Sequence, residues 1–204
     1  MSLSASLWAA SADQAAAALA HPFVRGLGDG SLPLPVFQVY VAQDAVFLES
    51  FARAYALGLA RSRDRATLEA FADLVAGVLE ELRLHAAYAE RWGTVAAAEP
   101  LPATSAYTDF LLATATLGAV GETCAAMAPC MRLYAHLGQS LDPDAAGPYG
   151  EWVRTYADPG FEALAVTLEE LLDRHATDGP EVRRAYRRAM DLELGFFDGA
   201  VLGA

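Results

Sequence analysis

A helix-forming pattern runs through this chain almost from end to end and leaves little room for other secondary structure. Of the 204 residues, 44 are Ala, which has the highest helix propensity, and runs of β-branched residues are few. Gly and Pro gather at a few breaks, and Thr104 is expected to cap the helix that follows the third break. We expect one all-α domain over residues 1–204, a bundle of seven or eight helices. The breaks predict helices over about residues 3–20, 34–62, 64–92, 104–117, 122–140 and from 180 onward.

Composition narrows the class of protein. Hydrophobic residues make up 54% and charged residues 20%, a balance that excludes a disordered chain. No apolar run reaches the roughly 20 residues that a bilayer span requires, and residues 1–20 lack the basic start of a signal peptide. Cys124 and Cys130 would lie about 9 Å apart along a shared helix, which is too far for a disulfide. We therefore expect free thiols in a soluble, cytoplasmic protein.

The residue types that are missing exclude further chemistry. The chain has no Lys, so it has neither a phosphate-loop lysine nor a Schiff-base nucleophile. Its net charge of −12 argues against nucleic-acid binding. A helical di-iron site requires inward-facing Glu-x-x-His pairs, and no such pair is found at His21, His85, His136 or His175. Glu81 lies four residues before His85, which is a weak metal-ligand motif. We expect no metal and no cofactor.

Several polar residues interrupt apolar helix faces. Asp44 shares its face with Tyr40 and Phe47, and Glu193 lies between pairs of apolar residues one turn away on either side. Each acid is either exposed or buried with a partner, and burial would raise the pKa of Glu193 toward that of a proton donor near neutral pH. Cys130 follows Pro129, and it is either a small buried hydrophobe or a thiol beside a helix kink.

Two tyrosines complete the set of candidates. Tyr107 and Tyr156 are expected near a helix start and a helix end, and a buried phenol needs a hydrogen-bond partner. Either Asp44 or Glu193 could provide that partner.

The order and spacing of four groups of segments resemble the TenA family, the thiaminase II group with the haem oxygenase-like helical fold. Together the segments span residues 20 to 200. The first is HPFV at 21–24 with GLGDG at 26–30, and the second is QD at 43–44 with FARAYAL at 51–57. The third is AYT at 106–108 with APCMRLY at 128–134, and the fourth is WVRTY at 152–156 with Glu193 and FF at 196–197.

The resemblance implies hydrolysis at the methylene carbon of an aminopyrimidine, with thiamin or an aminomethylpyrimidine as substrate and hydroxymethylpyrimidine as product. It assigns the nucleophile to Cys130 and the ring-nitrogen acid to Glu193, while Asp44 would hold the exocyclic amine. Similar proteins often carry tyrosine where this chain has Phe47, whose ring could still pack on a flat substrate. The expected substrate-binding residues are Asp44, Phe47, Tyr107, Tyr134 and Tyr156. The chemistry needs no organic cofactor, and the resemblance also implies a homotetramer.

Two other functions remain open at this point. One is a non-catalytic pyrimidine-binding or regulatory protein on the same scaffold. The other is a redox or metal enzyme of the wider haem oxygenase-like group, for which the inward His and Glu ligands are missing.

Overall fold

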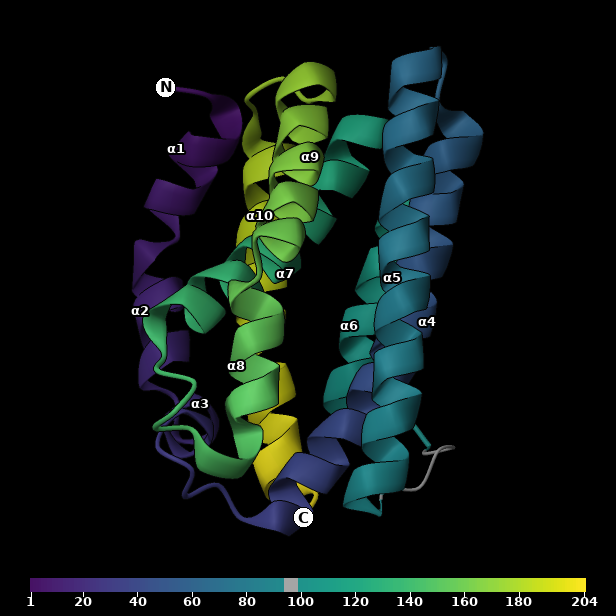
Figure 1. Cartoon of the computed structure of the whole chain (residues 1–204). Helices are drawn as coiled ribbons and strands as arrows, with labels where there is room; N and C mark the ends of the chain where they lie inside the picture. The colour runs from purple at the N-terminus through teal and green to yellow at the C-terminus, as the bar shows by residue number, and fades with distance from the viewer. Residues whose placement is uncertain (94–98) are drawn as a thin grey trace.

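The computed structural model describes the backbone of residues 1–93 and 99–204, and their side chains apart from those of residues 84–90. These residues form ten α-helices and one short 3-10 helix, with no strand among them, which confirms the all-α prediction (Figure 1). The elements are α1 (Leu3–Ala10), α2 (Ala12–Ala20), α3 (Pro22–Gly28), α4 (Leu34–Arg61), α5 (Arg65–Trp92), α6 (Pro102–Leu117), α7 (Val120–Ser140), η1 (Gly147–Tyr149), α8 (Gly150–Ala157), α9 (Pro159–His175) and α10 (Pro180–Leu202).

The expected count of seven or eight helices was too low, because the N-terminal region is more finely divided. The predicted helix over 3–20 breaks at Ser11 into α1 and α2. Pro22 then opens the unexpected α3, since proline fits a first-turn position, and Nδ1 of His21 accepts a hydrogen bond from the backbone N–H of Phe23 at 3.2 Å. Thr104 does not cap α6, which begins at Pro102.

Helix α7 lies at the centre of the bundle, where it packs against α9, α10, α8 and α6 (Figure 1). The two 28-residue helices α4 and α5 form an antiparallel pair along one side, and α4 also packs against α6 and α10. Helices α1 to α3 lie on the other side. None of the helices in the described part of the chain is long and apolar enough to cross a bilayer.

One buried amide fixes the start of α6 against α4. The side-chain oxygen of Gln43 accepts hydrogen bonds from the Leu101 backbone N–H at 2.8 Å and from the Thr104 hydroxyl at 2.6 Å. Its side-chain nitrogen donates to the backbone carbonyl of Glu99 at 3.0 Å. The Thr104 hydroxyl therefore links α6 to α4, and it fixes the position of Tyr107 one turn later on α6.

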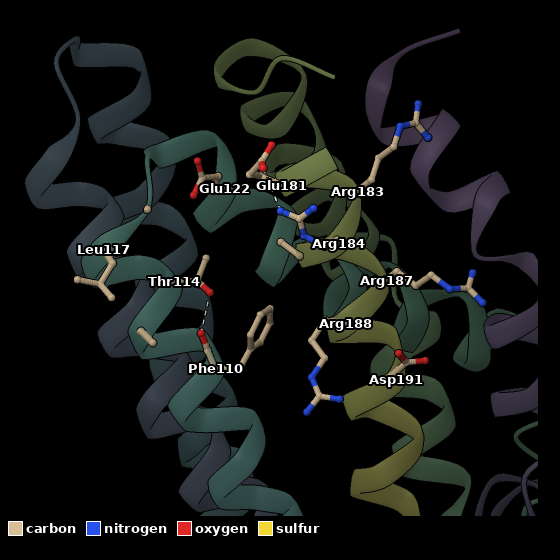
Figure 2. A pocket seen from close by; sticks show the side chains of 13 residues that line it. Phe110, Thr114, Leu117, Glu122, Glu181, Arg183, Arg184, Arg187, Arg188 and Asp191 are labelled. Carbon is tan, nitrogen blue, oxygen red and sulfur yellow. Dashed lines mark hydrogen bonds and ion pairs between the residues drawn. The ribbon is translucent and has the colours of Figure 1, made fainter. Parts of the chain in front are cut away.

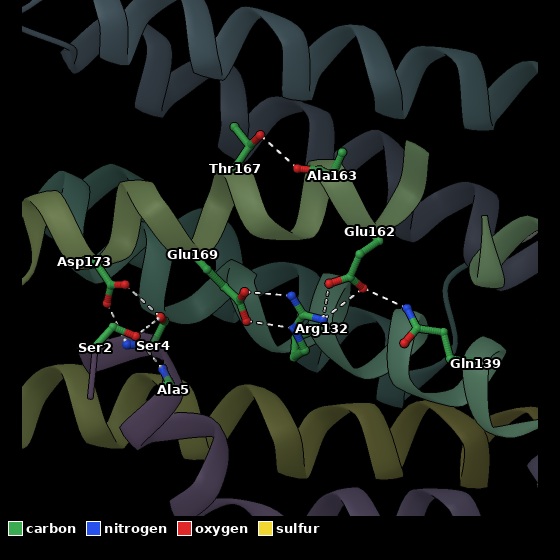
Figure 3. Close-up of polar contacts among 10 residues, drawn as sticks. All are labelled: Ser2, Ser4, Ala5, Arg132, Gln139, Glu162, Ala163, Thr167, Glu169 and Asp173. Carbon is green, nitrogen blue, oxygen red and sulfur yellow. Dashed lines mark hydrogen bonds and ion pairs between the residues drawn. The ribbon is translucent and has the colours of Figure 1, made fainter. Parts of the chain in front are cut away.

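A charged cluster joins α7 to α9 (Figure 3). The Arg132 guanidinium donates to both oxygens of Glu169, at 2.8 and 2.7 Å, and to both oxygens of Glu162, at 2.8 and 3.0 Å. Burial raises the pKa of Glu162, but hydrogen bonds from Arg132 and Gln139 outweigh it and hold the pKa below its usual value. Because Arg132 lies two residues after Cys130, this cluster anchors the part of α7 that carries the thiol.

Candidate active site

Five helices bring the seven sequence-predicted site residues into the interior. Helix α4 carries Asp44 and Phe47, α6 carries Tyr107, α7 carries Cys130 and Tyr134, α8 carries Tyr156 and α10 carries Glu193. All seven side chains are buried, and the most accessible, Cys130, is only 8% exposed. The open question of whether the acids are exposed or buried is therefore settled in favour of burial.

Glu193 and Tyr107 form a buried acid–phenol pair. The Tyr107 hydroxyl donates to Oε1 of Glu193 at 2.7 Å. Burial raises the pKa of Glu193 to about 7, although hydrogen bonding from Tyr107 and from Cys130 opposes the rise. The prediction that burial moves this acid toward neutral pH is confirmed. At physiological pH the carboxyl group can both accept and donate a proton.

The Cys130 thiol is held in its neutral form. Burial raises its pKa well above the usual value, and the nearby carboxylates of Glu193, Glu81 and Asp44 raise it further. The sulfur can therefore become a nucleophile only if a neighbouring group takes its proton as it reacts. Glu193 is placed to do this, because it interacts with Cys130 and titrates near neutral pH.

The chain's other thiol lies apart from these groups. Cys124 is fully buried, and burial raises its pKa to about 12 with no contribution from a carboxylate. It forms no disulfide, as expected.

A small cavity of about 10 Å³ opens beside the thiol, enough for about one water molecule. Five of the predicted residues line it, whereas Glu193 and Tyr107 do not. These two adjoin it through their neighbours: Glu193 interacts with Cys130, and the Tyr107 ring lies 4.7 Å from that of Phe47. The lining comprises Asp44, Phe47, Leu48, Phe51, Glu81, Cys130, Met131, Tyr134, Tyr156 and Phe161. A flat heterocycle would have to displace some of these side chains to bind.

The sequence analysis missed two polar residues: Glu81, which lines this cavity, and Tyr40, which bonds to the lining residue Tyr134. The Tyr156 hydroxyl donates to Oε1 of Glu81 at 2.7 Å, so the expectation that Asp44 or Glu193 would partner it was wrong. The Tyr40 hydroxyl donates to that of Tyr134 at 3.4 Å and accepts from Nε1 of Trp152 at 3.1 Å. Glu81 follows Val78 by three residues on α5, so it is another acid on an apolar face, the same signal that identified Asp44.

Metal ligands do not cluster in the described part of the chain, where no group of three His, Cys, Asp or Glu side chains is placed to hold an ion. The side chain of His85, whose pairing with Glu81 the sequence raised, lies outside the described residues.

A larger pocket of about 880 Å³ lies elsewhere, between α6, the start of α7 and α10 (Figure 2). Its wall on α10 carries Arg183, Arg184, Arg187 and Arg188, and Phe110 faces them from α6. None of the seven predicted residues lines it, and it contains no cysteine. The volume of a pocket alone therefore does not identify where the reactive groups of this chain lie.

Comparison with known proteins identifies the family of this chain. Residues 8–203 match the family described as TENA/THI-4/PQQC. The chain is 39% identical over 185 residues to an aminopyrimidine aminohydrolase of Halalkalibacterium halodurans, covering 86% of this chain and 83% of the relative. It is 33% identical to an aminopyrimidine aminohydrolase of Bacillus subtilis, covering 81% and 73%.

Solved structures show the same fold. A TenA homologue from Pyrococcus horikoshii superposes with a TM-score of 0.90 at 26% identity and full coverage of both chains. A TenA family transcription regulator from Silicibacter also gives a TM-score of 0.90, at 29% identity, covering 97% of this chain and 95% of that one. A Shewanella denitrificans domain with a TM-score of 0.76 at 15% identity, covering 98% and 92%, is described as having a haem oxygenase-like fold. The expected fold and family are therefore confirmed, and this chain belongs to the TENA/THI-4/PQQC family.

Proposed function

We propose that this protein is a hydrolase of thiamin salvage that releases hydroxymethylpyrimidine from thiamin or from an aminomethylpyrimidine derived from it. Relatives that are named aminopyrimidine aminohydrolases and match most of the chain support this class of reaction. The observation that carries the proposal is the buried contact of the Cys130 thiol with Glu193, whose pKa of about 7 suits proton transfer. The contact supplies a soft nucleophile and an acid–base group in one place.

The first step breaks the aromaticity of the ring. Glu193, as the carboxylate, takes the thiol proton while the sulfur of Cys130 adds to a ring carbon, and the carboxyl group then passes that proton to a ring nitrogen. Tyr107 holds Glu193 in place through its 2.7 Å hydrogen bond and stabilises the carboxylate form. The proton is only relayed, so no external acid is consumed.

The second step exchanges the leaving group for water. The C–N bond at the exocyclic methylene breaks, and its electron pair leaves with the nitrogen. Water then adds to the methylene carbon and gives a proton to Glu193, which passes it to the sulfur as the thiol is expelled from the ring. The ring nitrogen releases its proton to solvent, and aromaticity returns. In this scheme Asp44 holds the ring amine, while Phe47, Tyr134 and Tyr156 surround the flat heterocycle.

The domain organisation, cellular location and oligomeric state are proposed on the same resemblance. We propose that residues 1–204 act as one domain in the cytoplasm and that four copies associate as a homotetramer. Exposed apolar side chains such as Leu117 and Leu202, 84% and 86% exposed, leave surface available for association.

Turnover by the purified protein tests the function and compares its two substrates. We expect hydroxymethylpyrimidine to form from aminomethylpyrimidine, from thiamin or from both. The competing function is a regulatory pyrimidine-binding protein, which one structural relative's description as a transcription regulator favours. Tight pyrimidine binding in calorimetry without turnover of either compound would support that alternative and contradict hydrolysis.

A further inference from the structure

A second cavity adjoins the one beside Cys130. It has a volume of about 490 Å³ and lies between α5, α8 and α9. Its wall comes from Leu74, Gly77, Val78 and Glu80 on α5, Glu151, Arg154 and Thr155 on α8, and Leu164 on α9, with Tyr55 and Asp158. A chamber of this size exceeds the small cavity many times over and can hold a substantial substituent.

Three side chains belong to the walls of both cavities: Glu81, Met131 and Phe161. The chamber therefore begins where the small cavity ends. Met131 has an unbranched, flexible side chain and directly follows the proposed nucleophile, so it can yield when a ring enters. The one acid of this shared wall, Glu81, is held by the 2.7 Å hydrogen bond from the buried Tyr156 hydroxyl.

The chamber has an acidic wall. Among its described lining residues, Glu80, Glu81, Glu151 and Asp158 are acidic, whereas Arg154 alone is basic and pairs with Asp144 at 3.0 Å. Arg83 and Arg91 come from outside the wall to pair with Glu80 and Glu151. Acids still outnumber arginines, so the chamber attracts positive charge.

We propose that this chamber receives the leaving group of the reaction, and that Glu81 at its inner wall selects substrates whose leaving group is positively charged. This inference rests on the proposed function and extends it to specificity. Both proposed substrates fit, because thiamin carries a quaternary nitrogen at the bond that breaks and a primary aminomethyl group is protonated near neutral pH. The product carries a neutral hydroxyl group instead, so the chamber holds it less tightly.

Charge also determines which kinetic constant Glu81 affects. When the C–N bond breaks, the electron pair returns to the nitrogen, and the positive charge is lost as the group departs. Before that point, while the sulfur adds to the ring, the charge persists, so a carboxylate beside the nitrogen stabilises the bound substrate and the transition state for addition to a similar extent. Glu81 is then a positioning residue that lowers KM and leaves kcat nearly unchanged.

The test compares Glu81→Gln with Glu69→Gln, which lies on the same helix but lines neither cavity. Glutamine keeps an oxygen that can accept from Tyr156, so the substitution removes mainly the charge. We expect Glu81→Gln to raise KM for aminomethylpyrimidine and thiamin by about tenfold, which is about 1.4 kcal/mol and lies between a screened surface ion pair and a pair of charges in a medium of intermediate dielectric constant. Its kcat and its inhibition constant for hydroxymethylpyrimidine should change less than about threefold. The control Glu69→Gln should change KM, kcat and the inhibition constant less than about threefold.

Equal losses for the cationic substrates and the neutral product would overturn the inference, because Glu81 would then act on the ring or on the fold. An unchanged KM for both substrates would also overturn it. Failure of the wild-type protein to convert either substrate is a different result: it refutes the proposed function, and this extension falls with it.

Discussion

Replacing Tyr107 with Phe removes a hydrogen bond to Glu193 without touching the thiol. The hydroxyl lies 2.7 Å from the carboxylate oxygen, in a site where both side chains are 1% exposed. A hydrogen bond to a charged group contributes about 1.5–3 kcal/mol, and one pKa unit corresponds to about 1.4 kcal/mol. The pKa of Glu193, now about 7, should therefore rise by about one to two units in Tyr107→Phe.

The pH profile of kcat/KM measures this shift, because it reports the ionisation of the free enzyme. Glu193 must be ionised to take the thiol proton, so wild-type activity falls as the pH drops below about 7. In Tyr107→Phe this limb should move up by one to two units, lowering activity at pH 7 by about 5- to 50-fold and restoring most of it near pH 9. Tyr186→Phe is the matched control, since the Tyr186 hydroxyl on α10 is buried and makes no hydrogen bond to a described residue. An unmoved limb in Tyr107→Phe would refute the reasoning.

Three further substitutions test the energetics of the site and its support. The pKa of Glu193 is about 7 in the fold and 4.5 ordinarily, so the free energy of unfolding of the wild type falls as the pH rises through this interval. Urea unfolding should therefore show Glu193→Gln to be about 3 kcal/mol more stable than the wild type at pH 8 and nearly equal to it at pH 4. Equal gains at both pH values would contradict this. Phe47→Tyr should raise kcat/KM about 3- to 10-fold by adding one hydrogen bond beside the thiol, whereas a loss would mean that the small cavity cannot admit the oxygen. Arg132→Met leaves Glu162 and Glu169 without their arginine and should lower the free energy of unfolding at pH 7 by about 1–3 kcal/mol, a value reduced for partial exposure. In urea unfolding this loss should shrink below pH 4, because the two acids become protonated. A loss that does not depend on pH would point to packing instead.

Much of the fold was readable from local sequence, because helix breaks are local events. Gly118 ends α6, and Asp158 caps α9 by accepting from the Gly160 backbone N–H at 2.7 Å. The sequence also showed that Glu193 interrupts an apolar face, a pattern that left burial or exposure open and predicted a raised pKa only if the acid is buried. Ser11 and Pro22 were harder to interpret, since a residue that ends one helix can begin the next after a single turn.

The remaining parts of the site depend on contacts between distant segments. Tyr156 and Glu81 are 75 residues apart and meet only because the packed fold brings residues of α5, α7 and α8 to one small cavity. Thr104 has the features of a helix cap, yet its hydroxyl bonds Gln43, which is 61 residues away. No local pattern identifies such partners. The chamber beside Glu81 likewise exists only once three helices have packed.

The two cysteines of this chain allow the most direct test of the central claim, that the sulfur at position 130 attacks the ring. Both are buried thiols on α7, but only Cys130 interacts with Glu193. Turnover of aminomethylpyrimidine should be compared in Cys130→Ser and Cys124→Ser, with unfolding curves confirming that both variants are folded. We expect kcat to fall at least about 1000-fold in the first, because serine is a far weaker nucleophile, and to stay within about threefold of wild type in the second. Wild-type turnover by a folded Cys130→Ser protein would contradict the account.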